Sequence, residues 1–223
     1  MKINILFAII FTLAFFSPFT ANAQLAGNPE NWCRNGFFPR EKVDFYIGKI
    51  KAKRHERVYF YGDERNCPTG KNCRQKSFLL AGNEVLASRK FGDFSCVWFQ
   101  PEKGAETVGW IPTNKIEGQS FLTERYKPWL GEWKFYGNSL KITAGEKEGV
   151  FYVKGNAFWK GSRSNIHVGE IETKATLGED SILNLKDDDC EIRLDLVVYY
   201  LVVSDNLKCG GANVTFSGVY IKK

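Results

Sequence analysis

Cys209, Gly210 and Gly211 are residue types found at reactive thiols and in phosphate-binding loops. A phosphate loop leads into a helix and carries a Lys-Ser/Thr pair, whereas this stretch leads into the alternating pattern of a strand. A nucleophilic thiol needs a nearby base, and His55 and His167 are the only histidines. We therefore interpret Cys209 as a disulfide anchor, the two glycines as turn residues and the stretch up to Tyr220 as a closing strand.

His167-Val168-Gly169 and Asp189-Cys190-Glu191 contain fragments of a peptidase pattern. They resemble the His-Val-Gly and Asp-Cys-Ser-Gly motifs of NlpC-type cell-wall cysteine peptidases, which often occur with bacterial SH3 domains. Here the His precedes the Cys and the Ser-Gly is missing. We interpret His167 as a strand residue at a barrel rim, and we expect no catalytic residues and no enzyme activity.

Asp187, Asp188 and Asp189 offer clustered oxygen ligands for calcium. The interleaved spacing of a calcium loop is missing, so a solvated turn is the simpler interpretation. No Cys-x-x-Cys pair or His-x-x-x-His spacing supports zinc. We expect no metal site and no cofactor. The glycosylation sequon at Asn213, which we place on a barrel strand, is treated as incidental.

The N-terminus has the features of a secretory signal. Lys2, an apolar run over residues 3–16 and the Ala21-Asn22-Ala23 ending predict a cleaved signal peptide over residues 1–23. No later stretch approaches about 20 apolar residues, so we expect no membrane insertion after cleavage. The mature protein is expected in the periplasm or outside the cell.

All six cysteines follow the signal peptide, and an even count in an exported chain predicts disulfides. One pair closes a short loop with Pro68 and Gly70 at its bends, and a second ties a strand to the start of the closing strand. The expected bridges are Cys67–Cys73, Cys190–Cys209 and Cys33–Cys96.

The formal net charge of +6 falls by one when Lys2 is removed with the signal peptide. This mildly basic balance favours anionic partners, but it is too small to indicate nucleic acid. Lys49, Lys51 and Lys53 recur at every second position, which predicts that they share one face of a strand. Arg54 and Arg57 lie near the turn that follows. A solvated sheet edge explains the lysines most simply, because lysine discourages pairing between sheets. The functional alternative is docking to anionic wall polymer or to an acidic partner.

Four aromatic residues of the same half belong either to the core or to a peptide-binding cleft. The candidate ligand-binding residues are Lys49, Lys51, Lys53, Arg54, Arg57, Tyr59, Tyr61, Trp98 and Trp110.

Short apolar runs separated by Gly, Asn and Asp, without a sustained helical period, predict an all-β chain. A boundary near Gly118 divides the mature protein into residues 24–118 and 119–223. In the first half, Phe-Ser-Cys-Val-Trp-Phe, Val-Gly-Trp-Ile-Pro and Asn-Lys-Ile-Glu together resemble the bacterial SH3 domain, in which a Gly-Trp-hydrophobic-Pro strand precedes a short helical turn. The resemblance covers roughly residues 43–116 and implies an SH3-like barrel.

The second half alternates apolar and charged residues from Cys190 to Leu196, as in a half-buried strand. Its opening Trp-Leu-Gly-Glu-Trp-Lys and its closing stretch resemble small β-barrel modules of uncharacterised exported bacterial proteins, including lysozyme-inhibitor-like ones. We expect a second small antiparallel β-barrel or sandwich.

Two disulfide-stapled β domains without a catalytic set indicate a binding protein. The leading hypothesis is an exported protein that engages peptidoglycan or a protein acting on it. The alternative is an inhibitor or immunity protein that neutralises a cell-wall hydrolase. A cell-wall hydrolase is a distant third possibility, motivated only by the peptidase-like fragments.

Overall fold

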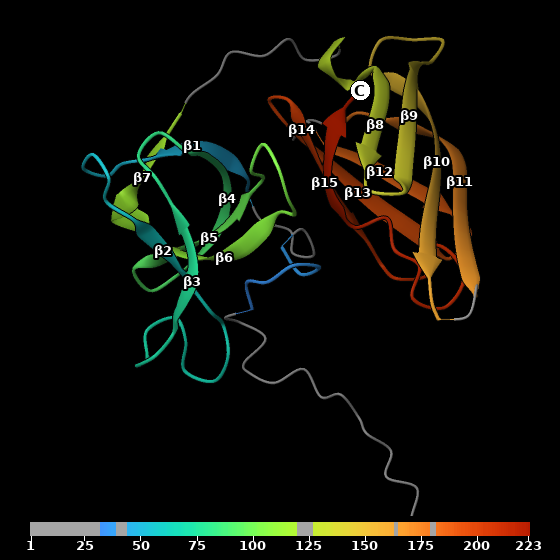
Figure 1. The fold of residues 1–223 in the computed structure, drawn as a ribbon. Coiled ribbons are helices and arrows are strands. Elements are labelled where there is room, and N and C mark those ends of the chain that lie inside the picture. Colours follow the sequence, from blue (N-terminus) through green and yellow to red (C-terminus); the bar gives the residue numbers. More distant parts are fainter. Residues whose placement is uncertain (1–31, 39–43, 120–126, 163–164, 179–181) are drawn as a thin grey trace, which may run out of the picture.

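In the computed structural model, residues 32–38, 44–119, 127–162, 165–178 and 182–223 are described. The signal peptide predicted over residues 1–23 and the linker after Gln119 lie outside these residues. The described chain is all-β, as predicted, and consists of two antiparallel sheets (Figure 1). Two three-residue 3-10 turns, Thr113–Lys115 and Lys127–Trp129, accompany them. No helix in this part of the chain is long and apolar enough to cross a membrane.

The first sheet has seven strands in the order β3-β2-β6-β5-β4-β1-β7. Residues that alternate inward along β2, β4 and β5 form its core with Leu79 of β3 and Ile111 of β6. The strands are β1 (Tyr46–Ile50), β2 (Val58–Tyr61), β3 (Arg74–Leu79), β4 (Glu84–Phe91), β5 (Phe94–Phe99), β6 (Thr107–Pro112) and β7 (Ile116–Gly118).

The segment 32–38 lies against this sheet through a buried carboxylate. Asp63 accepts hydrogen bonds of 2.7 Å from the Cys33 backbone N–H and from Arg34 Nε. The Cys33–Cys96 disulfide then ties the segment to β5. The other bridges are Cys67–Cys73 and Cys190–Cys209, so all three predicted pairs are confirmed. Bridges of this kind persist in oxidising compartments.

The second sheet is an eight-stranded meander that nearly closes into a barrel. Its first and last strands pair through Ile221↔Lys134 and Lys222↔Trp133, and the remaining seam is held by the bridge Leu177↔Leu183. The strands are β8 (Gly131–Phe135), β9 (Asn138–Ala144), β10 (Val150–Lys160), β11 (Ile166–Thr176), β12 (Ile182–Asp187), β13 (Cys190–Val197), β14 (Tyr200–Asp205) and β15 (Gly218–Lys222).

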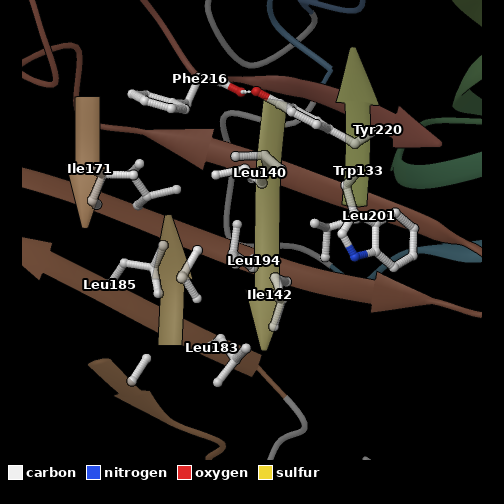
Figure 2. Packing of buried hydrophobic residues seen from close by; sticks show 14 of the residues in the cluster. Trp133, Leu140, Ile142, Ile171, Leu183, Leu185, Leu194, Leu201, Phe216 and Tyr220 are labelled. Carbon is white, nitrogen blue, oxygen red and sulfur yellow. Dashed lines mark hydrogen bonds between the residues drawn. The ribbon is translucent and has the colours of Figure 1, made fainter. Parts of the chain in front are cut away.

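Large side chains fill the barrel interior (Figure 2). Trp133, Leu140 and Leu194 point inward from three strands, and each is at most 1% exposed. The Tyr220 hydroxyl donates a 2.8 Å hydrogen bond to the Phe216 carbonyl, which satisfies the one polar group this ring buries. The barrel is therefore a packed core, as expected for a small barrel with side chains inside.

The connection between β14 and β15, residues 206–217, covers one end of the barrel, and we call it the plug loop. Its Val214 and Phe216 are buried in the barrel core. Asp205 holds the loop by accepting hydrogen bonds from the Phe216 backbone N–H (2.7 Å) and the Thr215 hydroxyl (2.8 Å). The closing strand consequently begins at Gly218, so its predicted start near Cys209 is wrong. Asn213 lies exposed in the loop and not on a strand.

The two halves meet through an apolar contact. Val202 and Val219 point outward from β14 and β15, yet they are 1% and 3% exposed because the first half covers them. Trp98 of β5 packs against Tyr200 with ring centroids 5.3 Å apart. Tyr199 and Tyr136 add hydrogen bonds to Glu84 and Glu106, respectively. Figure 1 shows β14 and β15 on the side of the barrel that faces the first half.

Candidate functional site

A row of cations and aromatic rings covers the outer surface of the β2–β3 hairpin. The Arg57 guanidinium carbon lies 4.5 Å from the centroid of the Phe78 ring, and that of Arg74 lies 4.6 Å from the Tyr59 ring. The two rings contact each other edge to face, with centroids 5.9 Å apart. We call Arg57, Tyr59, Arg74, Lys76 and Phe78 the basic–aromatic face.

Strand register assembles this face. Val58 pairs with Leu79 and both point inward, so their neighbours Tyr59 and Phe78 pair on the outside. The register then shifts between Tyr59 and Tyr61, which brings Arg74 opposite Tyr61. β3 is an edge strand of its sheet, and residues 74–78 are all exposed.

The guanidinium groups of the basic–aromatic face have no acidic partner among the described residues: no ion pair there involves Arg57 or Arg74. Glu56 precedes Arg57 but bonds instead to Lys115 Nζ (2.5 Å) and to the Lys53 backbone N–H (2.8 Å). These two hydrogen bonds lower the pKa of Glu56. Its negative charge is thus directed away from the face.

Charge is unevenly divided between the halves. Residues 24–118 contain 16 Lys and Arg against 11 Asp and Glu, whereas residues 119–223 contain 14 of each. On the barrel, cations stand beside carboxylates, as in Lys154–Glu172 (2.7 Å) and Lys174–Glu146 (2.6 Å). The positive excess of the mature protein therefore belongs to the half that carries the basic–aromatic face.

The structure separates the predicted lysine strip into two parts. Lys49 lies inside the sheet on β1, opposite Glu84 of β4 and Glu117 of β7. Lys51, Lys53 and Arg54 follow the end of β1 in a turn, exposed to solvent. The lysines consequently do not share one strand face. The sheet-edge explanation is also wrong for Lys49, because β1 pairs on both sides.

The predicted aromatic residues fall into different environments. Trp110 is fully buried beside Phe91, and Trp98 is buried at the contact between the halves. Tyr61 is half-buried against Phe94, with ring centroids 5.1 Å apart. Of the four, Tyr59 is the one that the structure places on the basic–aromatic face.

Cys190 and His167 of the peptidase-like fragments make structural contacts within the protein. Cys190 and Cys209 are bonded to each other, and none of the six cysteines is free. His167 Nδ1 lies 2.5 Å from the Ala212 carbonyl oxygen of the plug loop, and its ring contacts Trp159. Asp188 occupies the exposed β12–β13 turn. Among the described residues, no three His, Cys, Asp or Glu side chains gather as a metal site requires.

Sequence reasoning missed Arg74, Lys76 and Phe78. Their spacing of two residues is the signal of a common strand face. The polar start of β3 hid that signal, because Arg-Gln-Lys-Ser after Cys73 has the composition of a loop. Pairing with β2 is what makes these residues a strand.

No family model, curated protein or solved structure matches this chain.

Proposed function

We propose that this chain is an exported, non-catalytic binding protein that engages peptidoglycan or a protein acting on it. The observation that carries this proposal is the basic–aromatic face, with two guanidinium groups that no described carboxylate neutralises. The exposed turn with Lys53 and Arg54 leads directly into it along the chain. We also propose that the first half is an SH3-like domain. The 3-10 turn directly after Gly-Trp-Ile-Pro supports this part of the proposal. The three disulfides and the signal-like N-terminus support export.

Co-sedimentation with purified peptidoglycan tests the proposal. We expect binding at low salt that falls steeply towards 1 M salt, where exposed charges are screened within about 3 Å. Arg57→Gln/Arg74→Gln should bind weakly, and Lys49→Gln/Lys51→Gln/Lys53→Gln should show whether the lysines contribute. The control Lys154→Gln/Lys174→Gln removes two cations that already have carboxylate partners, so it should bind like the parent. Absence of binding at every salt concentration would refute wall attachment.

The alternative role, an inhibitor or immunity protein, is favoured by one feature of the barrel. Phe158 and Val168 pair across β10 and β11 and are each 50% exposed, with Ile166 nearby at 57%. Exposed apolar clusters occur at protein–protein contacts. If this role holds, the protein should slow peptidoglycan lysis by a wall hydrolase, and Phe158→Ser/Val168→Ser should abolish that effect.

A further inference from the structure

Both aromatic rings of the basic–aromatic face already contact side chains of the protein itself. Arg57 lies over Phe78 and Arg74 lies over Tyr59, so each ring has a guanidinium against it. The edge-to-face contact between the rings occupies them further. Sugar rings bind proteins by stacking on open aromatic faces, and these two rings are partly covered.

The arginines, in contrast, keep their hydrogen-bonding groups available. A guanidinium that stacks on a ring with its flat face leaves its N–H groups pointing outward in the plane. Those N–H groups form a fork that matches the two oxygens of a carboxylate or phosphate. Because the rings already hold the guanidinium groups in place, less side-chain freedom is lost when an oxyanion binds.

The arrangement also offers more than one anion position. Arg57 and Arg74 each lie over a different ring of the Tyr59–Phe78 pair, and the strand register separates them along the hairpin. Lys76 alternates with Arg74 and Phe78 along the exposed β3 strand and adds a third positive group. A single small anion would use one of these groups, whereas a chain of anions would use all three.

We propose that the basic–aromatic face binds the oxyanions of a linear polyanion, with its carboxylates or phosphates paired to Arg57 and Arg74, and that it does not bind neutral sugar rings. This inference rests on the proposed function only in naming wall polymers as the source of the anions. Both carboxylates of peptide stems and phosphates of wall-linked polymers have the required chemistry.

Calorimetric titration with three probes tests the chemistry: polyphosphate, poly-L-glutamate and the neutral sugar chitohexaose. We expect the parent to bind at least one of the two polyanions and not chitohexaose. Arg57→Lys/Arg74→Lys keeps the charge but removes the fork, so the dissociation constant should rise about tenfold. Tyr59→Leu/Phe78→Leu keeps both arginines but removes their support, and it should also weaken binding.

Lys154→Gln/Lys174→Gln changes the net charge as much as Arg57→Gln/Arg74→Gln does, and should leave the dissociation constant within twofold. The inference is overturned if chitohexaose binds as tightly as the polyanions, if neither polyanion binds, or if the Arg→Lys variant binds like the parent. Circular dichroism of each variant confirms that the fold is retained.

The same variants separate this inference from the proposed function. If the parent sediments with peptidoglycan but binds neither polyphosphate nor poly-L-glutamate, the inference fails while wall binding stands. If polyphosphate or poly-L-glutamate binds through the arginines and peptidoglycan does not bind, the wall proposal fails while the inference stands. Sacculi stripped of phosphate polymers by acid identify the source: retained binding assigns the carboxylates and lost binding assigns the phosphates, and either result supports the inference.

Discussion

Two glycines explain why the Cys209-Gly210-Gly211 stretch is architecture. A Cβ on Gly169 of β11 would lie 2.1 Å from the Cys209 carbonyl oxygen, and one on Gly210 would lie 2.7 Å from Gly169 Cα. The plug loop therefore rests on β11 backbone to backbone, and the Gly211 N–H donates to the Val168 carbonyl at 3.2 Å. Any side chain at these two positions would separate the loop from the barrel.

We expect Gly169→Ala to lower the free energy of unfolding by about 1–3 kcal/mol, as overpacking typically does. The control is Gly62→Ala, since a Cβ there has its nearest neighbour at 3.6 Å, an ordinary contact. Urea denaturation of both variants measures the difference. Equal stability of the Gly169→Ala variant and the parent would mean that the loop does not pack as described.

At this scale the sequence predicted the cysteine partners but not the close backbone approach. A disulfide needs two cysteines and a plausible loop between them, and both are visible in the chain. The approach of Gly210 to Gly169 depends on how the barrel curves, and no local pattern encodes that. The positions of Lys49, on a strand that is paired on both sides, and of Trp98, at the contact between the halves, could not be predicted for the same reason. Both depend on the order of the strands and on how the two halves pack, which no local pattern encodes.

At the scale of the elements, a disulfide anchors the plug loop. It lies outside the strand ladder, and the Cys190–Cys209 bridge joins its start to the first residue of β13. Strong alternation of apolar and charged residues predicted the strand from Cys190 to Leu196, which is β13. The polar start of β3 gives no such signal, because those residues become a strand by pairing with β2.

Removing this bridge in Cys190→Ala/Cys209→Ala should cost about 3 kcal/mol, the value that loop-closure entropy gives for a loop of roughly this length. Hydrogen exchange should accelerate first at the Val214 and Phe216 amides, because the loop loses its anchor before the barrel opens. The Cys67–Cys73 bridge closes a much shorter loop, so removing it in Cys67→Ala/Cys73→Ala should lower the free energy of unfolding by less. A larger loss from the short bridge would contradict this ordering.

For the whole molecule, the contact between the halves is the feature that local pattern reading misses. The run Leu201–Val203 is buried on both faces of β14, although the barrel covers only one. Such a continuous apolar run is typical of a strand with partners on both sides. The predicted boundary near Gly118 remains a prediction about separability, and the apolar contact tells us what separation would expose.

Val202→Asp should weaken the contact without entering the barrel core, because the side chain points towards the first half. An unpaired charge in an apolar contact should cost about 3 kcal/mol of coupling between the halves. Calorimetry should then resolve two unfolding transitions where the parent shows one. The control Ile221→Asp changes an exposed apolar residue and should leave a single transition. Parent-like melting of Val202→Asp would show that the halves do not depend on this contact.

High pH should loosen the same contact. Burial, followed by the nearby Glu84 carboxylate, raises the pKa of Tyr200 to about 12, and the same two causes raise the pKa of Tyr199. The folded state thus favours the neutral hydroxyls, so their contribution to stability is complete below pH 10, the ordinary tyrosine pKa, and is lost as pH rises towards 12. Tyr220 in the barrel core also has a raised pKa, so it must be kept constant in any comparison.

The comparison is the free energy of unfolding of the parent and of Tyr199→Phe/Tyr200→Phe at pH 9, 10.5 and 11.5. Both proteins should lose stability as Tyr220 and the ion-paired Lys154 and Lys174, whose pKa values are raised, titrate. The parent should lose more, because it alone carries hydroxyls that must stay protonated beside Glu84 at the contact. Parallel curves would show that these hydroxyls ionise as readily in the folded protein as in the unfolded chain, and would place the coupling of the two halves in the apolar packing around Val202 alone.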